Sequence, residues 1–144
     1  MGKILALDVG EKTIGIAQSD DSETYSFPGK TIWRQEGYRR DMIVLRELVE
    51  REEITEIVVG MPFSMSGNRG VQAQKVGEFI EALKRYVKVP IHEEDERLST
   101  FEAETILAAA NRRRDRHKEV VDSIAASVIL ESFLERRKQE AAST

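Results

Sequence analysis

Cysteine is missing from all 144 residues, so disulfide bonds, zinc–thiolate centres and cysteine nucleophiles are excluded. Long apolar runs are missing too, since none approaches the roughly 20 residues that a membrane-spanning helix needs. The chain enters an apolar segment almost at once, without the basic stretch and apolar core of a signal peptide. We therefore expect a cytoplasmic protein with no membrane partner.

An excess of positive charge is also absent, because 26 acidic residues outnumber 22 basic ones and the net charge is −4. This balance argues mildly against a protein that coats nucleic acid without specificity, but it does not exclude a nuclease whose carboxylates lower the net charge while a local basic patch holds the phosphates. The chain is 40% hydrophobic and 33% charged, which is typical of a globular protein. We predict one domain over residues 1–139 and a flexible tail over residues 140–144.

Hydrophobic patterning predicts an α/β fold. The expected strands cover residues 4–8, 13–17, 24–34, 56–61 and 89–91. The expected helices cover residues 38–53, 68–86, 99–110 and about 118–139. The first three strands follow one another as a meander, with Pro28 interrupting the third, and the last two are reached through helices. We therefore predict a mixed five-stranded sheet, a three-strand meander plus two parallel strands, flanked by helices.

Three acidic residues stand at the ends of expected elements. Asp8 ends the first strand, Glu96 (or Asp95 beside it) follows the last strand, and Asp122 heads an apolar stripe of the last helix. If they meet at one sheet edge, their repulsion favours a hard divalent cation, Mg²⁺ or Mn²⁺. Two such ions would activate a water molecule and stabilise the leaving oxygen of a phosphodiester.

Each of these acids also has a purely structural interpretation. Asp8 would then cap a turn, residues 93–96 would form a solvated acidic loop, and Asp122 would favour a helix N-terminus through the helix dipole. The basic residues likewise read either as phosphate contacts or as a solvated arginine-rich loop. The residues concerned are Lys12, Arg112, Arg113, Arg114 and Lys118.

Four blocks of the chain resemble the bacterial YqgF/RuvX family: LDVGEKTIGIA, IVVGMPFSMSGNRG, EDERLST and VVDSIAASVILESF. That family is ribonuclease H-like, and its members are described as pre-16S rRNA nucleases and as Holliday junction resolvase-like proteins. The resemblance implies that Asp8, Glu96 and Asp122 are the metal-binding acids and that Arg97 contacts a phosphate or the transition state. The related RuvC-type resolvases carry an acid at the end of the fourth strand, where this chain has Gly60-Met61-Pro62.

The same resemblance implies further site features and an activity. The glycines of the first hairpin, Gly10 and Gly15, match positions where the backbone turns sharply or passes close to the metal site. Gly60, Pro62 and Gly67 match the loop that borders the substrate groove. The implied activity is metal-dependent cleavage of structured RNA in the maturation of pre-16S rRNA, with ribosomal particles as further partners.

Other functions stay open at this point. The same site would serve a Holliday junction resolvase acting on branched DNA, which needs a dimer, whereas the nuclease is expected to be a monomer or a weak homodimer. The Asp-x-Gly-x-x-x-x-Gly hairpin is also similar to the phosphate-binding hairpin of actin-like and sugar-kinase ATPases, although 144 residues leave no room for their second domain. A non-catalytic RNA-binding module is the remaining alternative.

Overall fold

The computed structural model describes residues 2–22, 26–62, 70–95 and 114–142, and at its centre lies one mixed sheet. The strands are β1 (Lys3–Val9), β2 (Thr13–Ser19), β3 (Ser26–Pro28), β4 (Ile32–Trp33), β5 (Ile54–Met61) and β6 (Ile91–Asp95). Their order is β3-β2-β1-β5-β6, with β4 also paired to β2. The meander is antiparallel, while β5 and β6 run parallel to β1 and to each other. The predicted mixed sheet is confirmed, its third strand being present as two short segments, β3 and β4.

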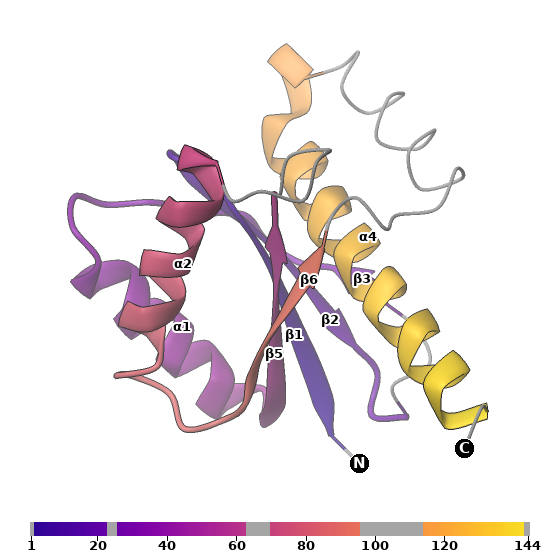
Figure 1. The fold of residues 1–144 in the computed structure, drawn as a ribbon. Coiled ribbons are helices and arrows are strands. Elements are labelled where there is room, and N and C mark those ends of the chain that lie inside the picture. The colour runs from indigo at the N-terminus through magenta and orange to yellow at the C-terminus, as the bar shows by residue number, and fades with distance from the viewer. Residues whose placement is uncertain (1, 23–25, 63–69, 96–113, 143–144) are drawn as a thin grey trace.

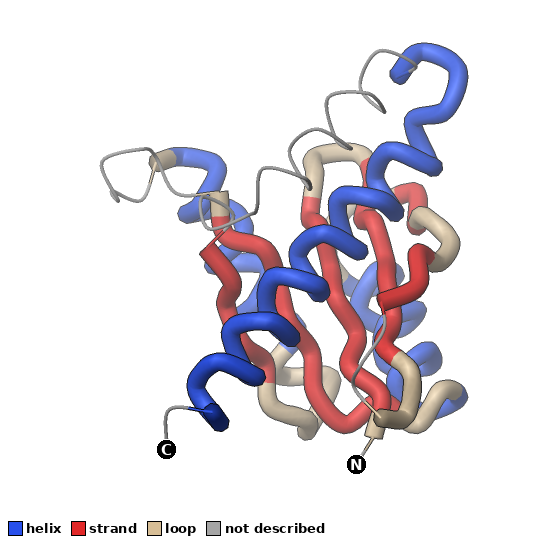
Figure 2. The backbone as a smooth tube through the Cα atoms, turned by 90° about the vertical axis from the view of Figure 1, so that its right-hand side faces the viewer, coloured by secondary structure: helices blue, strands red, loops and turns tan. Residues whose placement is uncertain are grey.

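Helices cover both faces of this sheet. Helices α1 (Arg39–Arg51) and α2 (Val71–Leu83) lie on one face, and α4 (Arg114–Ala142) crosses the other (Figures 1 and 2). Strand β1 is apolar on both sides because alternate residues enter different cores: Leu5 and Leu7 pack on the α1 and α2 side, while Ile4 and Ala6 pack under α4. None of the helices described here has the length and apolar character needed to cross a bilayer.

The last strand begins and ends later than expected. It spans Ile91–Asp95 instead of residues 89–91, so the acidic run lies within the sheet. Glu94 is only 1% exposed and accepts hydrogen bonds from the hydroxyl of Ser132, at 3.0 Å, and from the guanidinium of Arg136. Burial raises the pKa of Glu94, and these two hydrogen bonds oppose that rise. A solvated acidic loop is therefore the wrong description of residues 93–95.

The last helix is also longer than expected. It begins at Arg114 and ends at Ala142, so Arg114 and Lys118 belong to the helix and not to an arginine-rich loop. The physical reason is that residues 114–119 are mostly good helix formers and contain neither glycine nor proline. At the other end, no breaker stops the helix at residue 139. The helix expected over residues 99–110 lies outside the described residues.

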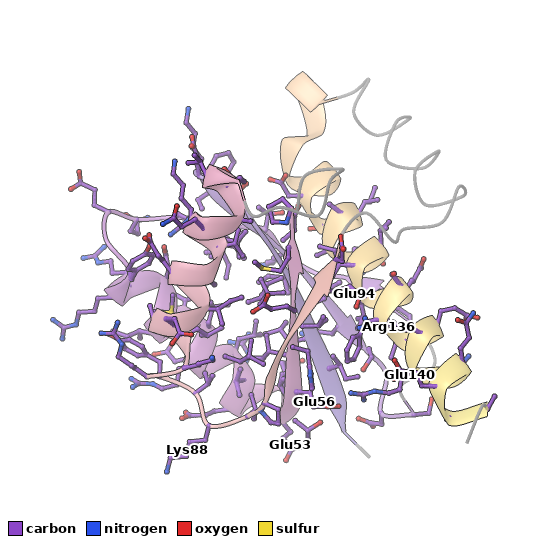
Figure 3. All side chains as sticks on the ribbon, viewed as in Figure 1. Glu53, Glu56, Lys88, Glu94, Arg136 and Glu140 are labelled. Atoms are coloured by element: carbon purple, nitrogen blue, oxygen red, sulfur yellow. The ribbon has the colours of Figure 1, made fainter. Side chains whose placement is uncertain are left out.

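Besides the ion pair of Glu94 and Arg136, a second ion pair joins helix α4 to the sheet. Both outer guanidinium nitrogens of Arg137 donate to the carboxylate of Glu56 on β5, each at 2.8 Å. His92 on β6 lies 3.0 Å from the same carboxylate, and its ring packs on Phe133 with 5.3 Å between centroids. Together with Glu94 and Arg136, these contacts fix the position of α4 across β5 and β6 (Figure 3).

The Glu56–Arg137 contact makes stability depend on pH. The paired Arg137 lowers the pKa of Glu56 to about 2 from its ordinary 4.5. A carboxyl whose pKa is lower in the folded state stabilises above pH 4.5 and loses that contribution as the pH falls toward 2. We expect Glu56→Gln to remove about 2 kcal/mol of unfolding free energy at pH 7 and much less at pH 3.

Urea unfolding at several pH values checks this expectation. The matched control is Glu131→Gln, because Glu131 lies exposed on α4. Its free energy of unfolding should change with pH in the same way as that of the parent protein. A Glu56→Gln variant that loses the same free energy at pH 3 as at pH 7 would contradict the assignment.

Candidate active site

A cleft of about 490 Å³ opens at the edge of the sheet where β1 ends and β2 begins. Asp8 and Asp122 both line it, together with Lys12, Gly60 and Pro62. Since β1, β5 and β6 are parallel, their carboxyl ends reach this same edge. The structure thus brings together two of the three acids, one basic residue and two of the loop residues that the sequence pointed to.

Asp8 occupies the cleft because of its place in the strand. It is half-buried, and it follows Ile4 and Ala6 in the alternation that faces α4. Its partner across the antiparallel pair is Gly15 of β2. The side chain of Asp8 therefore rises from the sheet on the face that α4 covers.

Asp122 is placed by the close approach of α4 to β2. The hydroxyl of Thr13 donates to its carboxylate at 2.6 Å. A Cβ on Gly15 would lie 2.0 Å from the carbonyl oxygen of Asp122, so only glycine allows the helix to lie this near. The expected close backbone approach at Gly15 is confirmed, and Thr13 is a positioning residue that the sequence analysis missed.

The third acid is not described directly, because Glu96 and Arg97 lie outside the described residues. The alternation of side chains along β6 still bears on whether Asp95 or Glu96 is the third candidate metal ligand. Asp95 pairs with Met61, which belongs to the core under α1 and α2, on the opposite face from Asp8. The side chain of Asp95 is therefore poorly placed to bind the same metal ion as Asp8.

The carboxylates of the cleft fit a hard divalent cation by their chemistry. Asp8 and Asp122 offer only oxygen donors, which Mg²⁺ and Mn²⁺ prefer. Within the described part of the chain, no group of three acidic, histidine or cysteine side chains gathers closely enough to hold a metal. The third predicted ligand, Glu96, lies outside that part of the chain.

An ion pair that the sequence analysis missed supports the turn between β1 and β2. The guanidinium of Arg34 donates to the carbonyl oxygen of Gly10 at 2.8 Å and to Asp41 at 3.2 Å. Asp41 is only 1% exposed and also accepts the backbone N–H of Gln35. The sequence feature that pointed to this ion pair is Asp41, an acid directly before Met42 on the buried side of helix α1. This pair holds one wall of the cleft in place.

The basic candidates divide into three groups. Lys12 is exposed and lines the cleft, as expected for a phosphate contact. Arg114 and Lys118 lie in the first turns of α4. Arg112 and Arg113, like Gly67 of the loop after β5, lie outside the described residues. Contacts between these basic residues and phosphate remain predictions.

Comparison with solved structures identifies the fold. The RuvC protein of Thermus thermophilus bound to a Holliday junction substrate superposes with a TM-score of 0.59, covering 94% of this chain and 96% of that one at 16% identity. A second Thermus thermophilus RuvC structure gives a TM-score of 0.58. This likeness confirms the ribonuclease H-like fold.

Sequence comparison goes further and identifies the family. A relative named "Putative pre-16S rRNA nuclease" from Caldanaerobacter subterraneus is 39% identical over 137 residues, which cover 94% of this chain and 98% of the relative. Another of the same name, from Moorella thermoacetica, is 41% identical and covers 95% of this chain and 97% of the relative. The model of the RuvX family, described as "Holliday junction resolvase", matches residues 2–136, and the chain therefore belongs to the RuvX family.

Proposed function

We propose that this chain is a metal-dependent nuclease that hydrolyses phosphodiesters in structured RNA. Its role would be maturation of the 5′ end of pre-16S rRNA during ribosome biogenesis, in the cytoplasm and with ribosomal particles as partners. One observation carries the proposal: Asp8 and Asp122 line a single open cleft in a chain of the RuvX family. The names of the relatives point to the RNA substrate.

We assign a role to each candidate residue. Asp8, Asp122 and Glu96 would hold Mg²⁺ or Mn²⁺. When bound, the ion supplies Lewis-acid polarisation of the phosphodiester and a water of lowered pKa. Thr13 keeps the carboxylate of Asp122 directed into the cleft through its 2.6 Å hydrogen bond.

The substrate phosphates would be held by basic side chains. Lys12 stands at its wall, and its ammonium group is a flexible point charge suited to a phosphate oxygen. The further contacts that we propose are Arg97, Arg112, Arg113, Arg114 and Lys118. Such contacts position the backbone without reading its sequence, so selectivity must come from the shape of the substrate.

A second candidate function is resolution of Holliday junctions. The description of the family and the fold likeness to RuvC favour it. Resolution requires two sites presented to two strands, and hence a symmetric dimer. The proposed RNA nuclease acts as a monomer or a weak homodimer and has no such requirement.

A comparison of substrates separates the two functions. Purified protein is incubated with Mg²⁺ or Mn²⁺ and either precursor 16S rRNA or a four-way DNA junction. We expect cleavage of the RNA near the mature 5′ end and at least 10-fold slower cleavage of the junction. Preferential cleavage of the junction would replace the proposed function with the resolvase, and no cleavage of either by folded protein would refute both.

A further inference from the structure

Trp33 is the only tryptophan of the chain, and it lies on the short strand β4 next to the cleft. Its side chain is 49% exposed, whereas large aromatic side chains are usually mostly buried. Strand β4 pairs with β2, and among the described strands none pairs with its outer edge. A large aromatic surface therefore faces solvent at this edge of the sheet.

The pairing register places Trp33 on the same face of the sheet as the acids. Trp33 is paired with Thr13 across the antiparallel strands, and paired residues project to the same side with Cβ atoms about 5 Å apart. Thr13 itself donates to Asp122. Two residues before Trp33, the hydroxyl of Thr31 lies 3.1 Å from that of Ser123 on α4, which confirms the face.

Two exposed lysines, Lys12 and Lys30, lie near Trp33 in the chain or across the strand pair. Lys12 is exposed and its carbonyl accepts the backbone N–H of Arg34, the neighbour of Trp33, at 2.9 Å. Lys30 is exposed on the connection between β3 and β4. An exposed indole with lysines nearby in the chain is a combination suited to binding a base together with a neighbouring phosphate.

We propose that Trp33 stacks on an unpaired base of the nucleic acid whose phosphate enters the cleft. This proposal rests on the proposed function, because it takes nucleic acid as the ligand. It specifies the substrate class further: the strand must offer at least one unstacked nucleotide beside the cleaved phosphate, as a single-stranded end or junction does. Stacking accepts any base, so no sequence preference is required.

The chain supplies its own matched control. Phe27 on β3 is 55% exposed at the same edge of the sheet. It pairs with Gln18, whose partner Leu5 packs in the core under α1 and α2, so Phe27 projects to the opposite face. Truncation of Phe27 therefore removes an exposed aromatic group without touching the side that carries Asp122.

Fluorescence of the single tryptophan reports stacking directly. The full-length Asp8→Asn variant, used so that cleavage does not interfere, is titrated with a 12-nucleotide oligouridylate, a blunt RNA duplex of the same length, and an abasic 12-mer. We expect the oligouridylate to quench the emission and the other two ligands to leave it nearly unchanged. Equal quenching by the abasic strand would overturn the proposal, as would failure of the oligouridylate to bind.

Affinity measured by anisotropy of a labelled oligouridylate gives the second readout. Trp33→Ala should weaken binding about 5- to 100-fold, Trp33→Phe should retain most of the affinity, and Phe27→Ala should bind like the parent. Equal losses for Trp33→Ala and Phe27→Ala would overturn the proposal. So would emission that depends on protein concentration without RNA, since that indicates pairing of β4 between two copies.

The two proposals fail separately. If the proposed nuclease function is wrong, the protein does not cleave RNA but the oligouridylate still quenches the emission of Trp33. If the stacking proposal is wrong, the Trp33→Ala variant cleaves RNA at the parental rate and binds it with the parental affinity.

Discussion

Asp8→Asn is expected to lower the rate of RNA cleavage by about 10²- to 10³-fold while the protein stays folded. The substitution keeps the size and shape of the side chain but removes the negative charge that Asp8 of β1 contributes to the cleft. Because one of the two carboxylates that we assign to the metal is lost, affinity for a divalent cation should fall as well. Single-turnover cleavage rates and Mn²⁺ binding measured by calorimetry give both values.

The matched control for this variant is Asp21→Asn. Asp21 lies exposed in the turn after β2, so the same chemical change is made away from the cleft. Its cleavage rate and its metal affinity should equal those of the parent. Cleavage by Asp8→Asn at the parental rate would show that Asp8 is only a turn residue, and the assignment of the active site would then be wrong.

Gly15→Ala is expected to lower the free energy of unfolding by about 3 kcal/mol and to reduce cleavage strongly. The added methyl group would lie 2.0 Å from the carbonyl oxygen and 2.5 Å from the carbonyl carbon of Asp122. Both are backbone atoms, so α4 as a whole must shift, and overpacking of this kind is costly. The shift also moves the carboxylate of Asp122 away from Thr13.

Urea unfolding, followed by cleavage assays on the folded fraction, measures the two effects. Gly70→Ala serves as the control because nothing lies within 4 Å of its added methyl group. Residue 70 caps helix α2, so this control should lose no more than about 1 kcal/mol. A Gly15→Ala protein as stable and as active as Gly70→Ala would mean that α4 does not depend on this contact.

Much of the fold follows from local patterns in the sequence. Residues 4–7 and 57–59 form continuous apolar runs, which favour central strands covered on both faces, and the structure buries them in this way. The helix stripe of Asp122, Ala126 and Ile129 places the acid at the head of a buried face, and the structure puts it there. Parallel strands end at one edge, so the position of Asp8 there could be predicted, whereas its meeting with Asp122 was only a conditional expectation.

Other features depended on contacts between distant segments. The local sequence predicts a loop for the acidic residues 93–95, because acidic residues are rare in strands. Their strand forms because α4, some 40 residues later, brings Ser132 and Arg136 to the carboxylate of Glu94. A buried carboxylate is tolerated only when donors satisfy it, and no local pattern says where those donors are.

The sequence by itself therefore determined the order of the described elements, their apolar faces and the edge of the sheet where Asp8 lies. Only the tertiary structure decided which face each acid of β6 takes, which groups hold Asp122, and why residue 15 must be glycine. The physical reason is that periodicity is a property of neighbouring residues, whereas hydrogen-bond partners and close backbone approach are set by how α4 packs across β2, β5 and β6.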